Sequence, residues 1–167
     1  EWNAVVKRPE SVDVRVVLAF PDVYEIGMSH LGLKILQQVA NARPEVMAER
    51  AYAPWPDMEA AMRSAGIPLF SLETRHSARD FDIAGFSLPY ETLYTNMLNL
   101  LDLGGIPLRS QDRRAGDPLV IAGGHAAFNP EPLAEFVCGQ FVDRAQPPIA
   151  EVINVIRVGR RVAASQS

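Results

Sequence analysis

Short apolar runs alternate along the chain with longer segments whose apolar residues recur at helical spacing. The main predicted strands are residues 14–20, 46–53, 81–88 and 119–122. The short apolar run 119–122, between Pro118 and a glycine pair, is typical of a strand that is buried on both faces, as in parallel sheets. Two shorter runs, 69–72 and 141–142, predict further strands.

Helices are predicted between these strands. Leu31, Ile35, Leu36 and Val39 form an apolar stripe, and Ser29 is a suitable N-cap for a helix that runs to about residue 42. The other predicted helices are 58–65 between Asp57 and Gly66, 93–103 before a glycine pair, a short turn or helix at 133–137, and 149–158.

The alternation of strands and helices predicts an α/β fold. We expect a flavodoxin-like, doubly wound, mostly parallel five-stranded sheet in the order 2-1-3-4-5, with three layers, α/β/α. Residues 1–13 are then a lead-in segment, 14–158 the domain and 159–167 a frayed tail. The polar stretches 21–27, 73–80 and 109–117 are predicted loops.

Composition narrows the class of protein. The chain has 167 residues, of which 48% are hydrophobic and 22% charged, and its net charge of −4 does not favour a nucleic-acid surface. Cys138 is the only cysteine, so the chain offers no disulfide framework and no thiolate cluster. No apolar run reaches the roughly 18 residues of a membrane span, and the polar start is unlike a signal peptide, so we expect a cytoplasmic protein. A chain that begins at Glu1 suggests a trimmed or partial protein.

The candidate chemistry lies in the loops that follow the strands, because the carboxyl ends of parallel strands meet at one edge of the sheet. Residues 21–29, 87–92 and 123–129 are these loops. Gly123 and Gly124 have no Cβ, so a ligand can come close to the backbone there, and His125 then faces the crevice. A strand that simply ends in a flexible turn is the alternative.

The other candidates each have a structural alternative. Ser87 can donate to a cofactor or to the backbone, and Tyr24 and Tyr90 can stack on a planar ring or close the edge of the sheet. Glu25 and Glu91 can form an acid–base pair, although solvated loop acids are the simpler interpretation. The loop histidine His76 is expected to be solvated.

The stretch 20–33 reads Phe-Pro-Asp-Val-Tyr-Glu-Ile-Gly-Met-Ser-His-Leu-Gly-Leu. Together with Ala-Pro-Trp-Pro-Asp-Met at 53–58, Gly-Phe-Ser-Leu at 85–88, the Ala-Gly-Gly at 122–124 and the Phe-Asn-Pro-Glu-Pro at 128–132, it resembles a family of radical S-adenosylmethionine proteins. Members of that family carry an N-terminal cobalamin-binding domain of flavodoxin-like fold. The resemblance covers nearly all of residues 2–136.

The resemblance implies a corrinoid, cobalamin, held at the carboxyl edge of the sheet. It also implies a partner, the C-terminal barrel of the same parent protein, which binds S-adenosylmethionine and a four-iron four-sulfur cluster through a Cys-x3-Cys-x2-Cys motif. No catalytic residue and no metal ligand is implied for this chain. The implied cofactor-binding residues are Pro21, Tyr24, Gly27, Ser29, Ser87, Leu88, Tyr90, Gly123, Gly124 and His125.

The sequence departs from the family pattern in two places. The cluster motif is absent, so the chain by itself is not the radical enzyme. Residues 143–147 read Asp-Arg-Ala-Gln-Pro where the family has a Gly-acid-Gly-Glu turn. His30 also lacks the Asp-x-His-x-x-Gly spacing of the cobalamin proteins in which a histidine binds cobalt. Two alternatives therefore remain: a degenerate domain that binds no cofactor, and a free-standing enzyme that uses Glu25, Glu91 and His125.

Overall fold

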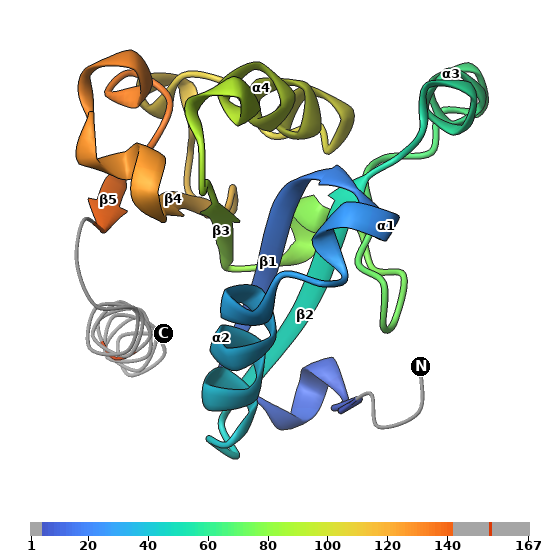
Figure 1. Cartoon of the computed structure of the whole chain (residues 1–167). Coiled ribbons are helices and arrows are strands. Elements are labelled where there is room, and N and C mark those ends of the chain that lie inside the picture. Colours follow the sequence, from blue (N-terminus) through green and yellow to red (C-terminus); the bar gives the residue numbers. More distant parts are fainter. Residues whose placement is uncertain (1–4, 142–153, 155–167) are drawn as a thin grey trace.

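The computed structural model of the chain describes residues 5–141 and 154. Its strands form a parallel sheet in the order β2-β1-β3-β4-β5 (Figure 1). The strands are β1 (Val14–Val23), β2 (Val46–Ala53), β3 (Ile83–Ser87), β4 (Leu119–Gly123) and the short β5 (Gly139–Phe141). The prediction of an α/β fold with a parallel sheet is confirmed, and the strand order is consistent with a flavodoxin-like topology.

The helices cover both faces of this sheet. They are α1 (Tyr24–Gly27), α2 (Leu31–Asn41), α3 (Pro56–Ala65) and α4 (Tyr94–Leu103). Figure 1 shows α2 and α4 on opposite sides of the strands, whereas α3 projects from the body of the domain. Short 3₁₀ turns lie at Pro9–Ser11, Ala78–Asp80, Glu91–Leu93, Ser110–Asp112, His125–Phe128 and Glu131–Leu133.

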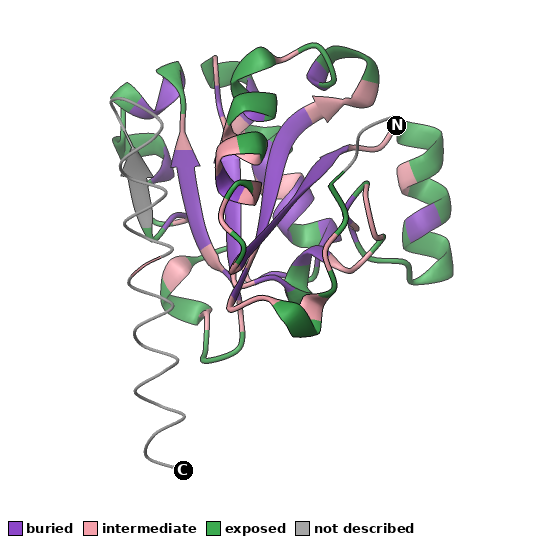
Figure 2. Ribbon diagram, turned by 90° about the horizontal axis from the view of Figure 1, so that it is seen from below, coloured by how far each residue is buried: buried purple, intermediate pink, exposed green. Residues whose placement is uncertain are grey.

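The core lies along the strands, which are buried, while the outer faces of the helices are exposed (Figure 2). Val16 of β1, Ile83 of β3 and Val120 of β4 are each 0% exposed. Burying one such side chain stabilises the fold by about 1.5–3 kcal/mol. The long apolar runs of the sequence are therefore explained by strands that are covered on both faces.

Two predicted boundaries near the end of β1 were wrong. The strand continues to Val23, past the expected end at residue 20, because a register shift between Phe20 and Val23 accommodates Pro21, which has no N–H. The N-cap of α2 is His30 and not Ser29: His30 Nδ1 accepts a hydrogen bond from the Leu33 N–H at 3.1 Å. The Ser29 hydroxyl instead donates to the Ile26 carbonyl at 2.8 Å.

The predicted strand at 69–72 is also wrong, since the structure has only an isolated bridge between Phe70 and Ser77 in this part of the chain. Two residues of the segment 69–78, Leu72 and Glu73, nevertheless bond to the edge of β2 at Arg50. The Leu72 N–H donates to the Arg50 carbonyl at 2.7 Å, and the Arg50 N–H donates to Glu73 Oε2 at 2.7 Å. Segment 69–78 thus covers the free edge of β2, which an uncovered parallel sheet would expose.

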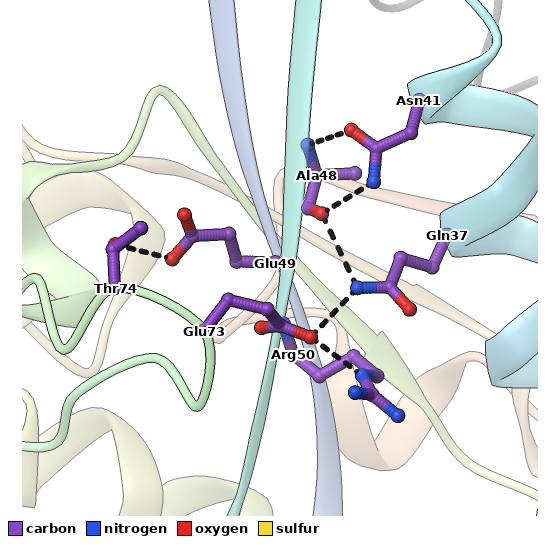
Figure 3. Close-up of polar contacts among 7 residues, drawn as sticks. All are labelled: Gln37, Asn41, Ala48, Glu49, Arg50, Glu73 and Thr74. Atoms are coloured by element: carbon purple, nitrogen blue, oxygen red, sulfur yellow. Dashed lines mark hydrogen bonds and ion pairs between the residues drawn. The ribbon is translucent and has the colours of Figure 1, made fainter. Parts of the chain in front are cut away.

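A buried ion pair holds segment 69–78 in place (Figure 3). Arg50 Nε lies 2.7 Å from Glu73 Oε1, and the two side chains are 4% and 1% exposed. Gln37 of α2 also donates to Glu73 Oε1, at 2.8 Å. The stretch 73–80 was predicted to be a polar loop. The polar side chain of Glu73 does not face water, because its carboxylate accepts from the Arg50 N–H and pairs with the Arg50 guanidinium.

Several predictions fall on parts of the chain outside the described residues. These are the helix at 149–158 except for residue 154, the departure at 143–147, the tail at 159–167 and the first residues of the lead-in. The last predicted strand, 141–142, corresponds in part to β5, which begins earlier, at Gly139, and ends the continuously described chain at Phe141.

Candidate functional site

The loops that follow β1, β3 and β4 lie at the carboxyl edge of the parallel sheet, as predicted, and the loop after β2 lies at the same edge. The Trp55 indole N–H donates to Glu25 Oε2 at 3.2 Å and so joins the loop after β2 to α1. The Tyr90 hydroxyl donates to Asp22 Oδ2 at 3.3 Å and joins the loop after β3 to the end of β1. These two hydrogen bonds join three of the loops, and the Ala126 N–H, which donates to the Leu88 carbonyl, joins the loop after β4 to them.

These joined loops carry a row of exposed apolar side chains. Trp55 is 54% exposed, Ile26 50%, Met28 38%, Tyr90 40% and Phe128 57%. A monomeric protein rarely leaves apolar side chains together on one surface unless something covers them. We refer to these five residues as the apolar row.

Acidic side chains accompany the apolar row. Asp22, Glu25, Asp57 and Glu91 belong to the same loops, whose sequences, 21–29, 54–58, 88–93 and 124–129, contain no lysine or arginine. Burial raises the pKa of the Tyr90 hydroxyl, and the neighbouring charge of Asp22 raises it further. Tyr90 therefore stays protonated at neutral pH and remains a hydrogen-bond donor to Asp22.

The packing of the protein itself explains why glycine stands at two positions of the predicted cofactor site, Gly27 and Gly124. Gly124 has φ 110°, and a Cβ on it would lie 2.6 Å from the Leu88 carbonyl oxygen. A Cβ on Gly27 would lie 2.5 Å from carbons of the Tyr52 ring. Protein atoms occupy the space that the missing side chains leave, and no ligand is needed to explain either glycine.

Hydrogen bonds fix the backbone around Gly124. The Leu88 N–H donates to the Gly123 carbonyl at 2.7 Å, and the Ala126 N–H donates to the Leu88 carbonyl at 3.0 Å. The Tyr94 hydroxyl donates to the Ala126 carbonyl at 2.8 Å. The ends of β3 and β4 are thus held together by backbone contacts, which no pattern in the sequence indicated.

The remaining residues of the predicted cofactor site lie at this edge with differing exposure. Pro21 is buried, and its carbonyl accepts from Asn96 at 3.0 Å. Tyr24 packs edge-on against Tyr52, with ring centroids 5.4 Å apart. Ser29 and His125 are exposed, Ser87 and Gly123 are half-buried, and Leu88 is buried. A role for any of these residues in binding a cofactor stays a prediction.

The histidines outside the predicted site have protein partners. The His30 ring accepts the cap hydrogen bond of α2, and burial lowers the pKa of His30, which favours the neutral ring. His76 was expected to be merely solvated, but its Nδ1 contacts the Thr74 hydroxyl, which donates to the buried carboxylate of Glu49 at 2.7 Å. The described residues include no group of three histidine, cysteine, aspartate or glutamate side chains arranged to hold a metal ion.

Sequence reasoning missed an apolar pocket at the β2 end of the same edge. Its volume is about 140 Å³. The end of β2, helix α3 and the start of segment 69–78 form its walls, with these lining residues: Tyr24, Ala51, Tyr52, Ala53, Pro54, Met58, Met62, Leu69, Phe70 and Leu72. Met58 and Met62, four residues apart on one helix, were the sequence signal that an apolar stripe faces this space.

The carboxyl edge fits one part of a corrinoid and not another. The apolar row, with Ser29 and His125 beside it, offers apolar contacts and hydrogen bonds to a flat ring with polar substituents lying on the surface. The filled spaces beside Gly27 and Gly124 leave no room there for a group inserted between the strand ends.

Comparison with known families assigns the class of this domain. The family described as radical SAM proteins, N-terminal, matches residues 32–166. The chain therefore belongs to the family of N-terminal domains of radical S-adenosylmethionine proteins. Such a domain implies a C-terminal catalytic domain in the parent protein. No curated protein matches the sequence. No helix within the described residues is long and apolar enough to cross a membrane, and the cytoplasmic location stays a prediction.

Proposed function

We propose that this domain holds a corrinoid, cobalamin in the first instance, on the carboxyl edge of its sheet and presents it to the catalytic domain of the parent protein. The observation that carries the proposal is the apolar row: five exposed apolar side chains belong to the loops at the strand ends, where open α/β sheets bind their ligands. The resemblance of the strand-end loops to cobalamin-binding domains supports the same assignment.

In this proposal the residues of the chain bind and orient, and none is catalytic. Ile26, Met28 and Phe128 would contact the face of the ring and exclude water from it. Ser29 and His125 would bond polar substituents. A bound corrinoid supplies a cobalt centre able to carry a methyl group or electrons, while S-adenosylmethionine and the four-iron cluster belong to the catalytic domain.

The test is an anaerobic titration of the 167-residue chain with hydroxocobalamin, followed by desalting and visible spectroscopy. We expect near-stoichiometric retention with a base-off spectrum, because no histidine has the spacing of the known cobalt ligand. Phe128→Asp should abolish retention. The matched control is Leu108→Asp, which changes an exposed apolar residue on the α4–β4 connection and should leave cobalamin retention unchanged.

A second candidate function, a domain that binds no cofactor and only packs on the catalytic domain, is favoured by the filled spaces at Gly27 and Gly124. The same titration on the full-length parent protein separates the two. If neither the isolated chain nor the parent retains cobalamin, the corrinoid proposal is wrong and the packing role remains.

A further inference from the structure

The pocket between β2 and α3 has the size of one large apolar side chain. Its volume is about 140 Å³. An apolar cavity of roughly 150 Å³ holds a molecule the size of benzene. The walls are alanine, methionine, leucine and aromatic side chains, and methionine adapts well to the shape of a partner. The pocket is therefore suited to a single leucine, methionine or phenylalanine side chain.

Helix α3 is incompletely covered by the residues that the structure describes. Of its ten residues, Met62 is the one that is buried, and the helix projects from the body in Figure 1. Met58 and Leu72 line the pocket and are nevertheless 46% and 38% exposed, and Trp55, just before the helix, is 54% exposed. Exposed methionine and aromatic side chains are enriched in protein interfaces, and the pocket has an exposed methionine in its lining and an exposed tryptophan next to that lining in the chain.

Two acidic residues flank lining residues of the pocket in the chain, Asp57 before Met58 and Glu25 after Tyr24, and we refer to them as the acidic rim. Asp57 and Glu25 are exposed, and Glu25 is held beside Trp55 by the indole hydrogen bond. Arg63, the basic residue of α3, is already engaged by Glu59 at 2.9 Å, Asp102 at 2.8 Å and Asn99 at 2.9 Å. An acidic rim disfavours nucleic acid and anionic membranes and favours a partner with lysine or arginine beside its apolar anchor.

Charge also argues against a second copy of this chain as the partner. In a two-fold symmetric contact each copy presents the same surface, so Asp57 and Glu25 would approach their own counterparts. The catalytic domain is tethered to this one in the parent protein, and tethering supplies a high effective concentration that makes one anchor sufficient.

We propose that the pocket between β2 and α3 receives one large apolar side chain of the parent's catalytic domain, with a lysine or arginine of that domain set against Asp57 and Glu25. The occupant is a basic, apolar protein surface in the same polypeptide. This inference rests on the catalytic domain that the family supplies and does not depend on the corrinoid.

The experiment uses the full-length parent protein and measures the rate of proteolysis between the two domains. Met58→Glu places a charge in the mouth of the pocket, and Asp57→Lys reverses the rim. We expect each to raise the cleavage rate about tenfold, as loss of a hot-spot contact would. Met58→Leu, which keeps the pocket apolar, and Leu108→Glu, which lies elsewhere, should leave the rate unchanged. Raised salt should speed cleavage of the wild type and not of Asp57→Lys.

Two further measurements show whether Met58→Glu acts on the interface, on the stability of the domain or on cobalamin binding. The isolated 167-residue chain should unfold at the same temperature with and without Met58→Glu, because Met58 is half exposed. Cobalamin retention should be unchanged by Met58→Glu. The cleavage rate therefore tests the proposed interface, and cobalamin retention tests the corrinoid proposal, independently of each other. An unchanged cleavage rate in both Met58→Glu and Asp57→Lys would overturn the inference, as would a wild-type dimer of the isolated chain that Met58→Glu dissociates.

Discussion

The two halves of the carboxyl edge are closed in different ways. Between β3 and β4 the backbone itself fills the space: Leu88 packs against Gly124 and is hydrogen-bonded to Gly123 and Ala126. Between β2 and α3 the edge is hollow, and the Arg50–Glu73 pair holds in place the segment 69–78, whose first residues line the hollow. We call the backbone contacts of Leu88 with Gly123, Gly124 and Ala126 the backbone seal, and the side-chain contacts around Arg50 and Glu73 the side-chain seal. The backbone seal tolerates almost no substitution, whereas the side-chain seal leaves an apolar pocket that a partner side chain can enter.

The largest expected effect tests the side-chain seal. Glu73→Ala leaves the Arg50 guanidinium buried without its carboxylate, which costs about 3–5 kcal/mol of the free energy of unfolding. Urea unfolding measures it. The exposed pair of Arg109 and Glu135, 3.1 Å apart, gives the control: Glu135→Ala should cost less than about 1 kcal/mol.

A double replacement sharpens this test. In Arg50→Met/Glu73→Leu neither charge of this pair remains buried, so much of the stability should return. A loss below about 1 kcal/mol in Glu73→Ala would contradict a buried ion pair as the seal of the β2 half.

The backbone seal is tested next, with a matched pair of glycines. Gly124→Ala combines a positive φ with a Cβ only 2.6 Å from the Leu88 carbonyl oxygen, and we expect a loss of about 3 kcal/mol. Gly116 has φ 102°, and no described atom lies within 4 Å of its Cβ position, so Gly116→Ala should cost about 1–2 kcal/mol. Equal losses by urea unfolding would show that backbone strain alone, and not the contact with Leu88, explains Gly124.

A third comparison makes the same methionine-to-alanine change in the closed core and beside the pocket. Met97 of α4 is 0% exposed in the closed core, and Met62 of α3 is 5% exposed beside the pocket. Met97→Ala should cost about 4 kcal/mol and Met62→Ala about 2 kcal/mol, because the wall of a pocket that is already hollow relaxes more easily. The reverse order in thermal or urea unfolding would mean that the pocket is closed in solution.

The sequence was sufficient for the features that depend on local pattern. Strand β2 begins and ends where its apolar run does, and Gly66 ends α3 in the left-handed conformation expected of it. The edge position of the predicted site residues followed from topology alone. The pocket and the backbone seal were not predictable, because both depend on how segments distant in sequence pack, such as Leu88 on Gly124 and Leu72 on Arg50.

The smallest expected effect lies at the start of α2, next to the hollow half of the edge. Burial lowers the pKa of His30 from its ordinary 6.5, and the neutral ring accepts the cap hydrogen bond from Leu33. The folded state therefore binds fewer protons than the unfolded state just below pH 6.5. This contribution to stability is fully present above pH 6.5 and is lost as the pH falls toward the lower pKa of the folded state.

His30→Ala removes the cap and should cost about 1 kcal/mol at pH 7.5. His30→Asn keeps an N-cap side chain that does not titrate, so its stability should match the wild type at pH 7.5 and exceed it at pH 5.5. Urea unfolding of both proteins at the two pH values measures this, and the other histidines, His76 and His125, cancel in the difference. If wild type and His30→Asn lose the same stability on acidification, the ring does not cap α2 as a neutral acceptor.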